Sequence, residues 1–185
     1  MRDSDFDFQE PFVLQDGREA LIRVVRPDDR ERIEAAFAQL EPRTIYSRFF
    51  TYRKQVPPET FERIGRIDFV HVAGLVVTVA GDNGETIIGG GGYVGRTAED
   101  GARAAELAFT IEEDFQHQGL ATRLFEALTQ IARRHGIVRF EAEVLAENLP
   151  MLNVFRHCGL ALRQRREGGI VRFEIDLAPA GPASA

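Results

Sequence analysis

Hydrophobic residues recur along this chain in two rhythms, and together they predict the order of its secondary structure elements. Apolar residues at every second position, or in short β-branched runs, indicate strands, whereas apolar residues three or four positions apart indicate helices. The predicted strands cover residues 20–26, 71–80, 86–94, 104–111, 137–145, 160–166 and 170–177. The predicted helices cover residues 28–40, 44–50, 58–67, 119–135 and 148–158.

The order of these elements predicts an α/β (α+β) protein with one mixed sheet. Strands joined by short turns, such as Gly81-Asp82-Asn83-Gly84, pair antiparallel. The strand–helix–strand unit over 104–145 instead predicts a parallel crossing. We therefore expect a mixed, mostly antiparallel sheet of about seven strands with helices on both faces.

The two ends of the chain differ from its middle. Residues 1–17 begin with an acidic stretch that Phe6 and Phe8 interrupt, and residues 178–185 contain only Ala, Pro, Gly, Ser. We expect a flexible lead-in over 1–17 and a disordered tail over 178–185. The chain has no internal repeat and no interdomain linker, so residues 18–177 are expected to form one domain.

Composition narrows the class of protein. With 23 basic and 29 acidic residues, the net charge of −6 argues against nucleic acid as the main partner. No apolar run approaches the roughly 20 residues of a membrane helix, and the polar start does not resemble a secretory signal. Cys158 is the single cysteine, and the histidines lack metal-binding spacing with a carboxylate, so we expect no disulfide and no metal. A cytoplasmic location fits this cysteine usage.

The stretch with the clearest chemical meaning lies where a strand that ends at Ile111 passes into a helix near Gly119. The first turn of a helix has backbone N–H groups without an intrahelical partner, and the helix dipole favours an anion there. Gly119 and Ala121 leave room for a pyrophosphate to approach the backbone. The alternative interpretation is that Gly119 only eases the turn.

The pattern over residues 116–121, Gln-x-x-Gly-x-Ala, resembles the coenzyme A signature of the GNAT acetyltransferases. The stretch from Asn148 to Leu160 is similar to the second signature of that family. The similarity covers roughly residues 18–177 and is strongest over 104–160. Three stretches also resemble the Pat-type bacterial protein lysine acetyltransferases: Ile22–Pro27, Tyr46–Phe50 and Ala105–Ile111.

The resemblance implies a GNAT fold in which a central pair of strands, 104–111 and 137–145, splays apart. The pantetheine arm of acetyl-coenzyme A would lie in the opening, with the thioester near the middle of the first strand. The residues that the resemblance assigns to this co-substrate are Phe109, Thr110, Ile111, Gln116, His117, Gln118, Gly119, Leu120, Ala121, Thr122, Asn148 and Phe155.

Glu106 is the candidate general base. Removing the proton of a lysine with a pKa of about 10.4 costs roughly 4–5 kcal/mol near pH 7, and a nearby carboxylate eases this step. Glu106 interrupts an otherwise apolar or small-residue strand and shares a face with Ala108 and Thr110. The resemblance to Pat-type enzymes also puts the base there. The alternative is a surface glutamate that pairs with a residue such as Arg103.

Phe155 departs from the family pattern. Many GNAT enzymes protonate the leaving thiolate with a tyrosine at this position, and a phenyl ring cannot donate a proton. Water or another group then protonates the thiolate, with His157 as a weak candidate, or no acid is needed.

Two further stretches have an expected role. The run Gly89–Gly92 has no following lysine or helix, so it predicts a strand bulge or a close approach of backbone or substrate, not a phosphate loop. In GNAT folds the region 46–50 shapes the acceptor site. Tyr46 and Arg48 are therefore candidates to face the substrate, while the two phenylalanines that follow are expected to pack.

The resemblance therefore implies an N-acetyltransferase that moves an acetyl group from acetyl-coenzyme A to an amine by direct attack. The leading acceptor is a lysine side chain of a protein, and a small amine or amino acid is the second interpretation. A third is an acyl-coenzyme A sensor that binds without turnover. The expected partners are acetyl-coenzyme A and the amine acceptor, with the protein acting as a monomer or homodimer.

Overall fold

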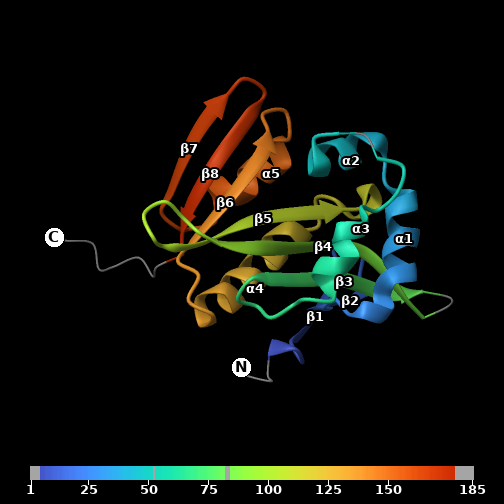
Figure 1. Ribbon diagram of the computed structural model, residues 1–185. Helices are drawn as coiled ribbons and strands as arrows, with labels where there is room; N and C mark the ends of the chain where they lie inside the picture. Colours follow the sequence, from blue (N-terminus) through green and yellow to red (C-terminus); the bar gives the residue numbers. More distant parts are fainter. Residues whose placement is uncertain (1–4, 52, 82–83, 178–185) are drawn as a thin grey trace.

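The computed structural model describes residues 5–51, 53–81 and 84–177, which fold around one open sheet (Figure 1). The strands are β1 (Gln9–Val13), β2 (Glu19–Val24), β3 (Val72–Gly81), β4 (Gly84–Thr97), β5 (Arg103–Ile111), β6 (Arg139–Leu145), β7 (Leu162–Glu167) and β8 (Ile170–Asp176). The helices are α1 (Arg30–Gln39), α2 (Pro42–Phe49), α3 (Pro58–Ile64), α4 (Leu120–Arg134) and α5 (Leu149–Arg156). The tail expected at 178–185 lies outside the described residues.

The sheet is mixed and mostly antiparallel, as the sequence predicts. Its strand order is β1-β2-β3-β4-β5-β6-β8-β7, and β5 and β6 form its parallel pair. Every predicted strand and helix is present, with ends shifted by a few residues. β3 and β4 meet at a Gly81–Gly84 pair, as expected for a hairpin, although Asp82 and Asn83 lie outside the described residues.

The sheet has one strand more than the seven named from the sequence, because Gln9–Val13, inside the expected lead-in over 1–17, forms a strand that pairs with β2. Phe12 is buried on this strand, and Pro11 is tolerated because the strand lies at the edge of the sheet. Asp5 is also buried and accepts hydrogen bonds from Arg134 at 2.6 Å and His135 at 2.7 Å. These contacts tie the start of the described chain to the end of α4.

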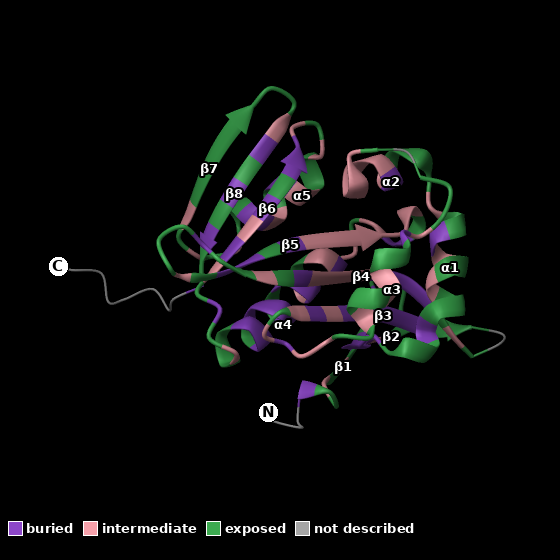
Figure 2. Ribbon diagram, in the orientation of Figure 1, coloured by how far each residue is buried: buried purple, intermediate pink, exposed green. Residues whose placement is uncertain are grey.

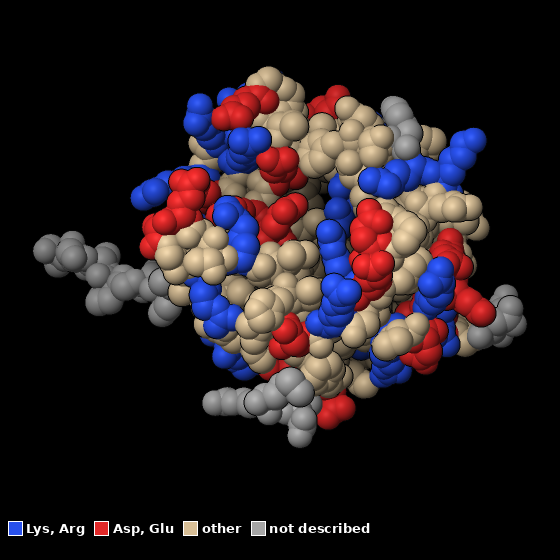
Figure 3. Space-filling view, viewed as in Figure 1, with Lys and Arg blue, Asp and Glu red and all other residues tan. Residues whose placement is uncertain are grey.

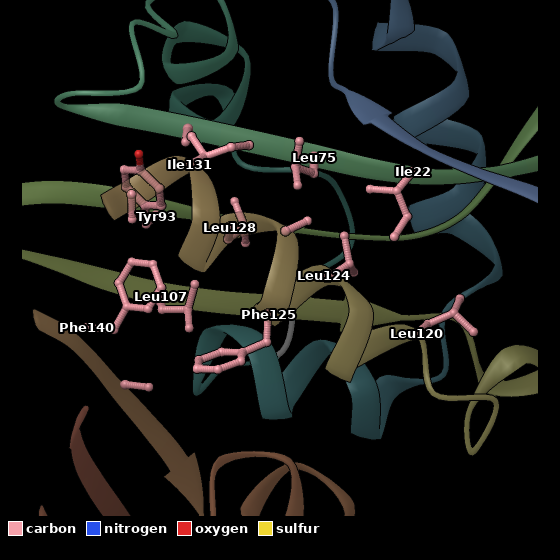
Figure 4. Close-up of a cluster of buried hydrophobic side chains, with 14 of the residues drawn as sticks. Ile22, Leu75, Tyr93, Leu107, Leu120, Leu124, Phe125, Leu128, Ile131 and Phe140 are labelled. Atoms are coloured by element: carbon pink, nitrogen blue, oxygen red, sulfur yellow. The ribbon is translucent and has the colours of Figure 1, made fainter. Parts of the chain in front are cut away.

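The main core lies between α4 and the sheet. Leu120, Leu124, Leu128 and Ile131 form the apolar stripe that the sequence predicts, and they pack against the inner face of the strands (Figure 4). Burial follows the layers: β6 and β8 alternate between buried and exposed residues, whereas the edge strand β7 is almost wholly exposed (Figure 2). None of the helices in the described residues is long and apolar enough to cross a membrane.

The opposite face of the sheet, which α1, α2 and α3 cover, is packed less completely. Its buried cluster is small, with Val25, Val76 and Ile87 at the centre. Under these helices β4 carries the predicted glycine run, and the β3–β4 register shifts between Val77 and Thr78, which is the expected bulge. A Cβ at Gly92 would collide with the backbone of β3. This face also has a cavity of about 330 Å³, and the glycine run Gly89–Gly92 forms part of its lining.

A buried ion-pair network joins β2 to the start of α1 and to β4. Arg23, which is 1% exposed, donates hydrogen bonds to Asp29 at 2.7 and 2.8 Å and to Glu85 at 2.6 Å. Asp29 also accepts from the backbone N–H of Arg26 at 2.9 Å. Burial alone would raise the pKa of Asp29, but the hydrogen bonds from Arg23 and Arg26 outweigh it and lower that pKa.

Removing this charge is expected to destabilise the fold. Asp29→Asn leaves Arg23 without its bidentate partner, so the free energy of unfolding should fall by about 3–5 kcal/mol in urea titrations at pH 7. Because folding depresses the pKa of Asp29, its contribution is present above its ordinary pKa of 3.8 and is lost as pH falls through the folded-state pKa. The difference between wild type and variant should therefore shrink as pH falls below 3.8. A difference that stays constant between pH 7 and pH 3 would contradict this assignment.

Candidate active site

The central strands part in the middle of the sheet. β5 and β6 pair at Ala104, Ala105 and Glu106. From Leu107 to Ile111, β5 keeps its antiparallel pairing with β4 but has no register partner among the described residues of β6. The splay that the resemblance implies is therefore present, and it exposes one backbone edge of β5.

A cleft of about 610 Å³ fills this opening. Its walls are β5, β6, the loop before α4, the start of α5 and one side of α2. Eleven of the twelve residues that the sequence assigned to the co-substrate line it: Phe109, Thr110, Ile111, Gln116, His117, Gly119, Leu120, Ala121, Thr122, Asn148 and Phe155.

Backbone donors gather at one end of the cleft. Gly119 is the N-cap of α4 with φ of 81°, in the left-handed region that glycine adopts without strain. From His117 to Thr122, no backbone N–H has an acceptor among the residues that the structure describes. A Cβ at Gly119 would meet nothing within 4 Å, so the space in front of these donors is open. The arrangement suits a phosphate or pyrophosphate.

The glutamines around this loop hold its shape. The side-chain amide of Gln116 donates to the carbonyl of Ile111 at 3.2 Å, which closes the strand-to-helix turn. The side-chain oxygen of Gln118 accepts from the backbone N–H of Gln15 at 3.3 Å. Gln118 is thus the one assigned residue that the structure does not bring to the cleft. The β1–β2 connection that holds it was not expected to be ordered.

The α5 side of the cleft combines a helix cap with an aromatic cluster. The Oδ1 atom of Asn148 accepts from the backbone N–H of Met151 at 3.2 Å, as expected for an N-cap. Phe155 is 1% exposed, and its ring lies 5.2 Å from that of Phe173 and 6.3 Å from that of Phe109. Phe155 therefore lines the cleft as a packed apolar group.

Glu106 belongs to the other cavity, on the face that α1–α3 cover. It lines the 330 Å³ cavity together with Ala108 and Thr110, which confirms that these three residues share a face. Ala108 and Thr110 also line the cleft, as does Arg48. The two cavities therefore adjoin across β5. Figure 3 shows this face hollowed, with acidic side chains on the β6 side of the hollow and basic ones on the α2 side.

The carboxylate of Glu106 is exposed and available. It has no hydrogen bond or ion pair with another residue in the described parts of the chain, so the alternative pairing with Arg103 is not formed. Its neighbour across the β5–β6 pair, Glu141, binds Arg96 instead. The carboxylate of Glu106 is therefore free to interact with a group bound in the 330 Å³ cavity.

Sequence reasoning missed one wall of the cleft. Arg43, Thr44 and Ser47 of α2 face the opening, opposite α5. The sequence does show that this short helix has a polar side opposite the buried Ile45. What was missing was the position of α2 over β5, which depends on tertiary packing. No group of three or more side chains suited to a metal occurs within the described ranges.

Comparisons with known proteins agree with this geometry. The profile of the acetyltransferase (GNAT) family matches residues 40–160. Acetyltransferase PA5475 of Pseudomonas aeruginosa is 31% identical over 154 residues, which cover 83% of this chain and 80% of that protein. Acetyltransferase Pat of Mycolicibacterium smegmatis is 30% identical over 171 residues; these are 91% of this chain but 49% of Pat, so the chain spans about half of that relative.

Among solved structures, the GNAT domain of S. lividans PAT superimposes with a TM-score of 0.78 at 33% identity. The alignment covers 91% of this chain and 96% of that domain.

Proposed function

The chain belongs to the GNAT acetyltransferase family, and on that premise we propose that it moves the acetyl group of acetyl-coenzyme A to the side chain of a lysine in a protein. The observation that carries this proposal is the meeting of two cavities across β5, with Glu106 on the acceptor side and phosphate-binding donors at the far end of the cleft. The choice of a protein lysine rests on the resemblance to Pat-type enzymes.

The residues present fit acetyl-coenzyme A. The backbone N–H groups of residues 117–122 would bind the pyrophosphate, and the free edge of β5 from Leu107 to Ile111 would hydrogen-bond the pantetheine arm. When bound, acetyl-coenzyme A supplies an activated acyl group with a thiolate leaving group. Phe155 would pack against the thiol end and exclude water there.

The cavity that would hold the amine substrate also contains the group that would remove its proton. Glu106 takes a proton from the lysine ammonium, directly or through one water, so that the neutral amine becomes a nucleophile. The 330 Å³ cavity that Glu106 lines is here called the acceptor cavity. Its apolar lining suits the methylene stem of the lysine, while the amine reaches the edge of β5 near Ala108. A backbone N–H of β5 would stabilise the oxyanion that forms.

The proposal can be tested on a proteome. The purified protein is incubated with acetyl-coenzyme A and a deacetylase-free cell lysate, and acetylated lysines are mapped by mass spectrometry against a sample without enzyme. New acetyl-lysine sites that depend on both the enzyme and acetyl-coenzyme A are expected. A lysate without new sites, combined with turnover of free amines, would show that the acceptor is a small molecule.

Phe155 is not expected to act as a proton donor. Phe155→Tyr should leave turnover unchanged or raise it, because a hydroxyl at this place adds a donor that the wild type does without. Phe155→Leu removes ring contacts with Phe173 and Phe109, and acetyl-coenzyme A affinity should fall several-fold. Steady-state kinetics and calorimetry measure the two effects. Wild-type affinity and turnover in Phe155→Leu would exclude even the packing role.

A further inference from the structure

Two arginines lie at the acceptor cavity. Arg48, at the end of α2, and Arg63, at the end of α3, both line it, and Arg48 also lines the cleft. The guanidinium of Arg48 lies 4.9 Å from the centre of the Phe49 ring, a cation–π contact that fixes its position. Figure 3 shows basic side chains gathered over α2 and the segment after it.

Unlike several other arginines of the protein, Arg48 and Arg63 do not have a carboxylate partner among the described residues. Arg23, Arg96 and Arg139 each bind a carboxylate. Arg48 and Arg63 form no ion pair with any residue that the structure describes. They are close enough to repel: burial and the positive charge of Arg63 both lower the pKa of Arg48, and the negative charge of Glu106 partly offsets this.

The carboxylates that line the cavity do not neutralise the charges of Arg48 and Arg63. Glu106 is the nearby one, and in the proposed reaction it is occupied by the ammonium of the acceptor. Glu112 also lines the cavity, but it lies six positions further along the chain, about 20 Å in an extended strand. It is not among the charges that act on Arg48. Two cations therefore remain beside the reacting amine without an anionic partner.

We propose that Arg48 and Arg63 bind a carboxylate of the acceptor, so that the preferred substrate is a protein lysine with an acidic residue beside it. This inference rests on the proposed function and adds the chemistry that selects the lysine. Guanidinium groups bind carboxylates through paired, charge-assisted hydrogen bonds. A carboxylate between the two arginines would relieve their repulsion, and the amine of the same substrate would then point toward Glu106.

The test compares peptides that differ only beside the lysine, with Glu, Gln or Arg as the flanking residues. Wild type is expected to acetylate the Glu-flanked peptide with kcat/KM about tenfold above the Gln-flanked one, mainly through KM. Arg63→Gln should remove this preference, so that the ratio of kcat/KM between the Glu-flanked and the Gln-flanked peptide falls to about one. Arg63 is the first choice because it lines the acceptor cavity and not the co-substrate cleft.

The matched control is Arg66→Gln, three residues further along the chain, which changes the same charge outside both cavities. It should keep the full preference for the Glu-flanked peptide. Arg63→Glu provides a second variant, and it should shift the preference toward the Arg-flanked peptide. A uniform loss on all peptides in Arg63→Gln would mean a structural role for this residue and overturn the inference.

A further arm identifies the source of the carboxylate. Free lysine and cadaverine differ by one carboxylate, and both are assayed beside the peptides. Free lysine acetylated better than the Glu-flanked peptide would place the carboxylate on a small molecule and overturn the protein acceptor. Equal rates on all three peptides would overturn this inference alone, whereas no acetylation of any acceptor by wild type would overturn the proposed function itself.

Discussion

Glu106→Gln is expected to lower turnover by roughly 10²–10⁴-fold while the affinity for acetyl-coenzyme A stays near wild type. Glutamine keeps the shape of the side chain but cannot accept the proton of the lysine. Glu106 lines the acceptor cavity and not the cleft, so the substitution leaves the walls of the co-substrate site intact. Because Glu106 forms no ion pair with a described residue, little structure depends on its charge.

The pH dependence separates a proton acceptor from a general electrostatic effect. The loss in Glu106→Gln should shrink as pH rises toward the pKa of lysine, because more of the amine is then already neutral. Turnover and calorimetric affinity are measured between pH 6.5 and 9.5, with the exposed Glu99→Gln as the control for charge removal near β5. A variant that turns over like wild type near pH 7 would remove Glu106 from the mechanism.

Gly119→Glu is expected to abolish acetyl-coenzyme A binding. The new carboxylate would stand at the start of α4, in front of the N–H groups of residues 117–122, and would repel the pyrophosphate as well as occupy its space. The left-handed φ of 81° adds a strain of roughly 1–2 kcal/mol for any residue other than glycine. That cost weakens the fold but does not by itself block binding.

The chain offers a control with the same backbone strain. Gly101 has φ of 79° and open space around its Cβ position, in the turn between β4 and β5. Gly101→Glu should lose similar stability and bind acetyl-coenzyme A normally. Calorimetry measures the affinity of both folded variants for acetyl-coenzyme A. Unchanged affinity in Gly119→Glu would contradict the placement of the pyrophosphate. Equal losses of affinity in both variants would show that backbone strain causes the effect.

The features that local sequence predicts are those that short-range patterns determine. The stripe along α4 follows from residues three and four positions apart, and the shared face of Glu106, Ala108 and Thr110 follows from strand alternation. The start of α4 at Gly119, to within one residue, and the cap of α5 at Asn148 also follow from local backbone chemistry.

The features that sequence reasoning missed depend on distant packing. The local sequence of β1 is typical of an acidic lead-in. The strand forms because it can pair with the edge of β2 and because Phe12 is buried in the core. Gln118 turns from the cleft because Gln15, 103 residues earlier, binds its side chain. The acceptor cavity exists because α1 and α3 cover a glycine-rich part of β4 incompletely, and no single segment carries that information.

The most direct test of the central claim follows the release of coenzyme A thiol when the protein is mixed with acetyl-coenzyme A and a lysine peptide. Thiol release is expected to equal the acetyl-lysine formed, and to be lost in both Glu106→Gln and Gly119→Glu at neutral pH. Tight binding of acetyl-coenzyme A by wild type without thiol release, for any peptide or small amine, would contradict the assignment. The protein would then be a sensor of acyl-coenzyme A and not an acetyltransferase.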